Sequence, residues 1–121
     1  MNEKKLNLLF KAFADPNRLR ILHILTHGER CVCDLMAVLK MGQSKVSRHL
    51  AFLRRAELVK ARREGLWIHY SLKKAGSAAH KKLLACLASC LDAPVFGRDM
   101  DFLEKLAKNK KDLREKKGCS I

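Results

Sequence analysis

Apolar side chains recur at helical spacing in the first third of the chain and predict three consecutive helices. Four apolar residues at i, i+3, i+4 and i+7 indicate a first amphipathic helix; they are Leu6, Leu9, Phe10 and Phe13. Asp15 and Pro16 supply an N-cap followed by proline at the first helical position, so a second helix is predicted from there to Gly28. A third, short helix carries Leu35 and is predicted to end near Gly42.

A fourth helix is predicted at about Ser44 to Arg55, and its two faces differ in chemistry. At about 100° per residue, three apolar side chains share one face; they are Val46, Leu50 and Leu53. The opposite face carries small, hydroxylic and cationic groups, which are Ser44, Arg48, Ala51 and Arg55, with Ser47 and His49 on its flanks. Small residues allow close approach to a DNA groove, while Arg and Ser bond bases or phosphates. This pattern is typical of a DNA-recognition helix.

Residues 58–72 alternate in polarity and predict a β-hairpin whose turn lies at Glu64 and Gly65. Lys60, Arg62 and Arg63 fall on or beside the tip of this hairpin. Two helices joined by a short turn and followed by a basic hairpin form a winged helix-turn-helix. The predicted fold class is therefore mainly α with a small β-hairpin.

A fifth helix is predicted after Gly76, and its stripe consists of His80, Leu83, Leu84, Leu87 and Leu91. Pro94 and Gly97 are expected to break it, and a last helix is predicted at about Arg98 to Arg114. The stripes of the first and fifth helices have no obvious partner inside a small domain, so we expect a dimer interface there, with packing inside the monomer as the alternative. Residues 1–115 are predicted to form one DNA-binding and dimerisation domain, followed by a flexible tail at 116–121.

The charge balance indicates a polyanionic partner. The 121 residues contain 26 Lys and Arg against 12 Asp and Glu, which gives a net charge of +14. Between residues 43 and 63 only Glu57 opposes a run of basic side chains. Charge alone does not separate DNA from RNA or an acidic membrane surface. The chain contains neither an apolar run of spanning length nor an N-terminal signal segment. We therefore expect a cytoplasmic protein with reduced cysteines.

Cys31 and Cys33 place two soft thiols at the start of the third helix, directly before the recognition helix. Thiolates select thiophilic ions, and a helix N-terminus lowers the pKa of a cysteine. Residues at i and i+2 lie about 200° apart on an ideal helix, so chelation is expected to distort the first turn and displace the recognition helix. The alternative is a pair of cysteines buried only for packing.

Together these motifs resemble the ArsR/SmtB family of metal-responsive repressors. The resemblance covers roughly Leu6 to Leu91 and rests on four segments, which are Ala14 to Leu22, Cys31 to Leu35, Gln43 to Leu50, and Glu64-Gly65 with Trp67 and Tyr70. It implies a homodimer that represses transcription until a metal binds, and the cysteine pair is similar to that of arsenite and antimonite sensors. In the closest sensors a third cysteine follows three positions after the second, where this chain has Met36. Cys119 is the candidate third ligand; a solvent or exogenous thiol is the alternative.

The resulting hypothesis is a repressor released from double-stranded DNA by As(III) or Sb(III), with no cofactor needed for DNA binding. The predicted metal ligands are Cys31, Cys33 and Cys119. The predicted DNA-binding residues are Gln43, Ser44, Lys45, Ser47, Arg48, His49, Arg55, Arg62 and Arg63. Alternatives within the same fold are a thiol-redox sensor or a sensor of Cd, Pb or Cu; a constitutive nucleic-acid binder is a further one.

Other reactive side chains carry weaker signals. The sequence gives no sign of an enzyme. It lacks an evident pair of carboxylates, a Ser/His/Asp set and an Arg shortly after the cysteines. Cys86 and Cys90 are spaced i, i+4 beside the leucine stripe, where packing is the favoured interpretation, and no role is assigned to them. His23 and His27 have zinc-compatible spacing but lack further ligands.

Overall fold

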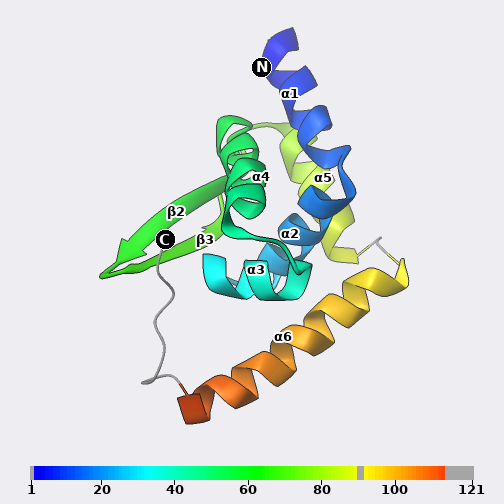
Figure 1. Cartoon of the computed structure of the whole chain (residues 1–121). Coiled ribbons are helices and arrows are strands. Elements are labelled where there is room, and N and C mark those ends of the chain that lie inside the picture. The colour runs from blue at the N-terminus through cyan, green and yellow to red at the C-terminus, as the bar shows by residue number, and fades with distance from the viewer. Residues whose placement is uncertain (1, 90–91, 114–121) are drawn as a thin grey trace.

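The computed structural model describes residues 2–89 and 92–113, with side chains described up to residue 109. These residues form helices at both ends of the chain and a small sheet between them (Figure 1). In chain order the elements are α1 Glu3–Phe13, α2 Pro16–Thr26, β1 Arg30–Cys31, α3 Val32–Leu39, α4 Gln43–Arg55, β2 Val59–Glu64, β3 Trp67–Leu72, α5 Ala78–Ser89 and α6 Pro94–Leu113. The predicted class, mainly α with a β-hairpin, is confirmed.

The start of α2 follows the predicted capping chemistry. One carboxylate oxygen of Asp15 accepts hydrogen bonds from the backbone N–H groups of Asn17 at 2.9 Å and Arg18 at 3.1 Å. These bonds satisfy donors that have no partner within the helix. Gly28, which follows the helix, has a φ of +132°, a value that favours glycine over residues with a side chain.

The sheet contains one more strand than the sequence predicted. The hairpin of β2 and β3 is confirmed, with Glu64 opposite Trp67 at its closed end and a φ of +63° at Gly65 in the turn. β1 adds to the other edge of β3, so the antiparallel order is β1-β3-β2, with Cys31 opposite His69. A two-residue strand is too short to produce an alternating pattern, which is why the sequence did not reveal it.

α5 and α6 are separate helices, as predicted, but the predicted start of the last helix at Arg98 is wrong, because α6 begins at Pro94 and continues through Gly97. Proline is well suited to the first turn of a helix, where its missing N–H costs no hydrogen bond. A Cβ added at Gly97 would meet nothing within 4 Å, so no close contact requires glycine there. Leu91 and residues 114–121 lie outside the described residues.

The core lies between α2, α3, α4 and the base of the sheet. α2 is its central helix, with four buried apolar residues, Ile21, Leu22, Ile24 and Leu25. The apolar stripes of α1 and α5 are partly buried within the monomer, where Leu9, Ala12 and Leu87 belong to the core. Leu6 and Phe10 of α1 remain 40% and 52% exposed. The monomer therefore accounts for part of each stripe and leaves apolar surface on α1.

α6 is held against α2 and α3 by a buried ion pair. Arg20 of α2 donates from Nε and Nη2 to both oxygens of Asp99, each at 2.9 Å, and Nη2 also lies 3.3 Å from the carbonyl oxygen of Val38 in α3. Asp99 is only 4% exposed. A bidentate pair of this kind fixes the relative orientation of the elements that it joins.

Replacing Asp99 with alanine is expected to lower the free energy of unfolding by about 3 kcal/mol, because Arg20 would keep its charge in a largely buried position without a carboxylate. Urea denaturation measures this change. Asp101→Ala removes an exposed carboxylate from the same helix and should change the free energy by less than about 0.5 kcal/mol. Equal effects of the two substitutions would show that the ion pair does not hold α6.

Candidate nucleic-acid interface and cysteine pair

α4 presents the amphipathic arrangement that the sequence predicted. Val46, Leu50 and Leu53 are buried against the core. The predicted DNA-binding residues Gln43, Ser44, Lys45, Arg48 and Arg55 are exposed, and Ser47 and His49 are half-buried. The buried face fixes the helix to the domain, and the other face leaves hydroxyl, amide and cationic groups open to a partner.

A hollow beside α4 contains a cation that sequence reasoning missed. The guanidinium of Arg18 in α2 lies 4.2 Å from the ring centre of Phe52, and that of Arg55 lies 5.1 Å from it. Arg18 also donates to the carbonyl oxygens of Ala12 at 3.1 Å and Lys11 at 2.9 Å near the end of α1. The hollow, of about 530 Å³, is lined by Arg18, Arg48, His49, Ala51, Phe52 and Arg55. No periodicity signal in the sequence identifies a contact of this kind.

His49 also lines this hollow, and its imidazole favours the neutral form near pH 7. Burial lowers its pKa; Asp15 opposes this change, while Arg18 and Arg48 add to it. A neutral imidazole offers one donor and one acceptor to a base or a phosphate.

The hairpin projects away from the helices (Figure 1), and its two predicted arginines differ in their surroundings. Arg62 donates to Glu29 at 2.6 and 3.1 Å and to Glu64 at 2.6 Å. These carboxylates raise the pKa of the Arg62 guanidinium above its usual value. Arg63 is also exposed, on the neighbouring position of β2. The basic residues lie on the hairpin as expected, and two carboxylates contact Arg62, which the sequence did not predict.

Cys31 and Cys33 lie at the start of α3, as predicted, but the two residues are not both helical. Cys31 is the N-cap, with φ −70° and ψ 147°, and makes no side-chain capping hydrogen bond. Its side chain is buried, whereas Cys33, in the first turn, is half-buried and disulfide-bonded. The angular argument for two helical cysteines is therefore wrong, because an extended Cys31 is not bound to a separation of about 200°.

Cys119, the third predicted ligand, lies outside the described residues. Within residues 2–89 and 92–113, no group of three or more His, Cys, Asp or Glu residues is arranged to hold a metal ion. Met36 packs against the core. His23 and His27 stack edge to face with ring centres 5.0 Å apart, and burial lowers the pKa of His23. Cys86 is exposed and Cys90 is outside the described residues.

The cysteine segment connects the two parts of the candidate interface. β1 pairs with β3 of the hairpin, placing Arg30 opposite Tyr70 and Cys31 opposite His69. α3 follows β1 directly and is joined to α4 by residues 40–42 only. Glu29, which holds Arg62, is two residues before Cys31. Residues 31–33 therefore lie between the strand that pairs with the hairpin and the helix that precedes α4.

Among the described helices, none combines the length and the apolar character of a membrane span.

Residues 15–61 match the model of the family described as bacterial regulatory protein, arsR family. The chain is 51% identical over 65 residues to the arsenical resistance operon repressor of Escherichia coli K12, covering 53% of this chain and 56% of that protein. It therefore spans little more than half the length of that relative.

Three further comparisons cover more of the related protein. The arsenical resistance operon repressor of Bacillus subtilis 168 is 42% identical over 79 residues, covering 60% of this chain and 75% of that one. The structure of HlyU from Vibrio cholerae N16961 has a TM-score of 0.62 at 37% identity, covering 72% and 94% of the two chains. A structure of reduced HlyU from the same source has a TM-score of 0.61 at 38% identity, covering 71% and 87%.

The matched family consists of DNA-binding transcriptional regulators rather than enzymes. The matched residues contain α2, the cysteine pair and the whole of α4, and they end within β2, so the similarity to the family model includes the helical part of the candidate interface. This chain belongs to the arsR family of bacterial regulatory proteins.

Proposed function

We propose that this chain is a transcriptional repressor that binds operator DNA as a homodimer and leaves it when As(III) or Sb(III) binds to cysteine thiolates. The observation that carries the proposal is the position of Cys31 and Cys33, at the junction of the hairpin sheet and the helix preceding α4. The names of the arsenical-resistance relatives support this choice of inducer.

DNA recognition is assigned to α4 and the hairpin. The exposed face of α4 enters the major groove, where Arg48 and Ser44 reach base edges or phosphates. The hairpin lies along the neighbouring backbone through Arg63 and Arg62. Exposed Leu6 and Phe10 on α1 supply apolar surface for a second copy of the chain, which a two-fold symmetric operator requires.

Release by metal acts at the start of α3 in this proposal, where Cys31 is the N-cap residue and its backbone also pairs with β3. Drawing both sulfurs, in their reduced form, onto one ion rotates residues 31–33. The movement reaches α4 through residues 40–42 and the hairpin through the β1–β3 pairing. Cys119 or an exogenous thiol completes the three sulfur ligands in this proposal.

A second candidate input is oxidation of thiols, and it is supported by the disulfide at Cys33 and by the similarity to reduced HlyU. Peroxide would take two electrons from two thiols, leaving one disulfide and two water molecules. Oxidation would act on the same turn of α3 as metal binding. The two candidates therefore differ in the chemical signal and share the proposed movement of residues 31–33.

Fluorescence anisotropy of a labelled operator separates these inputs. Under reducing conditions, arsenite should weaken DNA binding of the wild-type protein at least tenfold, and Cys31→Ser or Cys33→Ser should reduce this effect to less than about twofold. The matched control is Cys86→Ser, which removes an exposed cysteine from α5 and should respond like the wild type. Antimonite, Cd(II), Pb(II), Cu(I) and peroxide are titrated in parallel. Release by peroxide but not by arsenite would contradict the arsenite proposal and support the redox input.

Arg48→Ala should weaken operator binding roughly tenfold, because one exposed guanidinium on the DNA-facing side of α4 is lost. Lys105→Ala removes an exposed positive charge from α6 and should change the affinity by less than about twofold at the same salt concentration. If both substitutions weaken binding equally, net charge rather than α4 governs the interaction.

Glu29→Gln should strengthen operator binding about threefold, because a DNA phosphate then competes with one carboxylate fewer for Arg62. The same anisotropy assay measures the change. The control is the double variant Glu29→Gln with Arg62→Gln, compared with Arg62→Gln alone, which should show no gain. A gain that persists without Arg62 would mean that Glu29 acts through general charge repulsion.

A further inference from the structure

The hollow beside α4 lies along the C-terminal half of that helix, and Arg18 of α2 lines it together with residues of α4. Arg48, Ala51 and Arg55 belong both to this lining and to the exposed face of α4. Arg48 and Arg55 are separated by about two helical turns, or about 10 Å. The hollow is therefore part of the side of α4 to which DNA binding is assigned above.

Arg18 is held in place by contacts with two other helices. Its Nε and Nη2 donate to the carbonyl oxygens of Ala12 and Lys11 in α1, and its guanidinium lies 4.2 Å from the ring centre of Phe52 in α4. The side chain of Arg18 is only 16% exposed. A guanidinium that is fixed in this way before binding loses little conformational entropy when it binds an acceptor.

Arg18 keeps hydrogen-bonding capacity that these contacts do not use. A guanidinium has five N–H donors and stays charged, and the bonds to α1 come from Nε and Nη2. Nη1 lies 3.9 Å from a carboxylate oxygen of Asp15, which is beyond hydrogen-bond distance. The other oxygen of Asp15 accepts the two backbone bonds that cap α2. Nη1 can therefore still donate to an acceptor that enters the hollow.

The remaining polar groups of the hollow favour a negatively charged acceptor. The six lining residues include three arginines and no carboxylate. The guanidinium of Arg55 lies 5.1 Å from the centre of the same Phe52 ring that Arg18 contacts. His49 favours its neutral form, so it adds a hydrogen-bonding group without adding charge. The Asp15 carboxylate close to Arg18 offsets one of the three positive charges.

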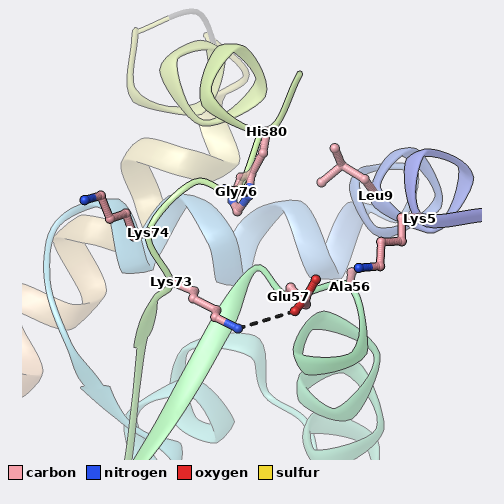
Figure 2. A pocket seen from close by; sticks show the side chains of 8 residues that line it. All are labelled: Lys5, Leu9, Ala56, Glu57, Lys73, Lys74, Gly76 and His80. Carbon is pink, nitrogen blue, oxygen red and sulfur yellow. Dashed lines mark hydrogen bonds and ion pairs between the residues drawn. The ribbon is translucent and has the colours of Figure 1, made fainter. Parts of the chain in front are cut away.

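The pocket at the C-terminal end of α4 lacks such a convergence of cations. There the ammonium of Lys73 lies 3.5 Å from the carboxylate of Glu57, and Lys74 points away from Lys5 and Lys73 (Figure 2). The lysines of that pocket therefore do not meet around one ligand. The hollow at Arg18 is the stronger candidate for an anion site.

The position of the hollow along α4 favours a backbone phosphate over a base. A recognition helix presents its N-terminal residues to base edges in the major groove, whereas Arg48 to Arg55 form the C-terminal part of α4. Arg18 comes from a different helix, so it lies beside α4. A guanidinium matches the oxygens of a phosphate in a bidentate geometry, and phosphates line both edges of the groove that α4 enters.

We propose that a phosphate of the DNA backbone enters this hollow and accepts hydrogen bonds from Arg18 and Arg55, whose guanidiniums both contact the ring of Phe52. Arg18 is then a sequence-independent DNA contact from α2, a helix to which no DNA contact is assigned above. This inference rests on the proposed recognition of DNA by α4 and is independent of the inducer.

Fluorescence anisotropy with two labelled duplexes of equal length tests the proposal; one is a palindromic duplex from the promoter of the gene, and the other has a scrambled sequence. Arg18→Met keeps an unbranched side chain against Phe52 and removes the charge. It should weaken binding of both duplexes about fivefold and lower the slope of log affinity against log salt concentration by about 0.9, the value for one phosphate contact. An unchanged slope, or a loss confined to the palindromic duplex, would overturn the proposal.

Two further variants separate a phosphate contact from other effects. Arg18→Lys keeps the charge and should retain the wild-type salt slope to within about 0.3; a slope as low as that of Arg18→Met would show that Arg18 only supports the fold. Arg98→Met removes an exposed arginine from α6 and should change the slope by less than about 0.3. Equal changes for Arg18→Met and Arg98→Met would show general attraction to a basic protein and overturn the proposal.

The wild-type chain allows a test that does not depend on how the Arg18 variants fold. In isotope-labelled protein, the Nε–H resonance of Arg18 should shift when the palindromic duplex is added, and a single neutral methylphosphonate at the contacted linkage should reduce that shift. An Nε–H resonance that does not move when the protein is saturated with DNA would overturn this inference alone. A wild-type chain that binds neither duplex would contradict the proposed function as well.

Discussion

The pairing of β1 with β3 is the constraint on which the rest of the candidate site depends. Cys31 belongs to two elements at once, because its backbone lies opposite His69 in the sheet and it also occupies the N-cap position of α3. The hairpin and α4 are the two parts of the candidate interface, and this short segment pairs with the first and leads into the helix before the second. α4 also contacts β2 directly, so the segment is one of two connections between them.

The elements around the segment at Cys31 are tightly packed, so a distortion there affects its neighbours. α2 and α4 are fixed by fully buried residues such as Ile21 and Leu50, and α6 is attached to α2 and α3 through Asp99. A close-packed interior does not absorb movement gradually. Distortion of the first turn of α3 is therefore expected to shift whole elements, which is what a change in DNA affinity requires.

Much of the fold could be predicted because its signals are local. The cap at Asp15, the two faces of α4 and the turn at Gly65 each follow from a few neighbouring residues. β1 could not be predicted, because two residues carry no periodicity and its partner is far along the chain. The start of α6 was missed because Pro94 was taken to end a helix, although proline is equally suited to begin one.

The candidate site was predictable in composition more than in geometry. The spacing of Cys31 and Cys33 and the basic face of α4 are properties of the sequence, whereas the carboxylates around Arg62 and the stacking of Arg18 on Phe52 depend on the tertiary fold. The pairing of Cys31 with β3 is another tertiary contact, and the extended backbone at Cys31 is also usual for an N-cap residue. In the folded chain, cations of the candidate interface therefore contact neighbouring carboxylates or an aromatic ring.

Amide hydrogen exchange of the arsenite-loaded protein tests the central claim most directly. Loss of protection at the backbone amides of residues 30–33 and of their partners His69 and Tyr70, together with weaker operator binding, is the predicted result. Unchanged protection at these amides, with operator binding nevertheless weakened by arsenite, would contradict the account.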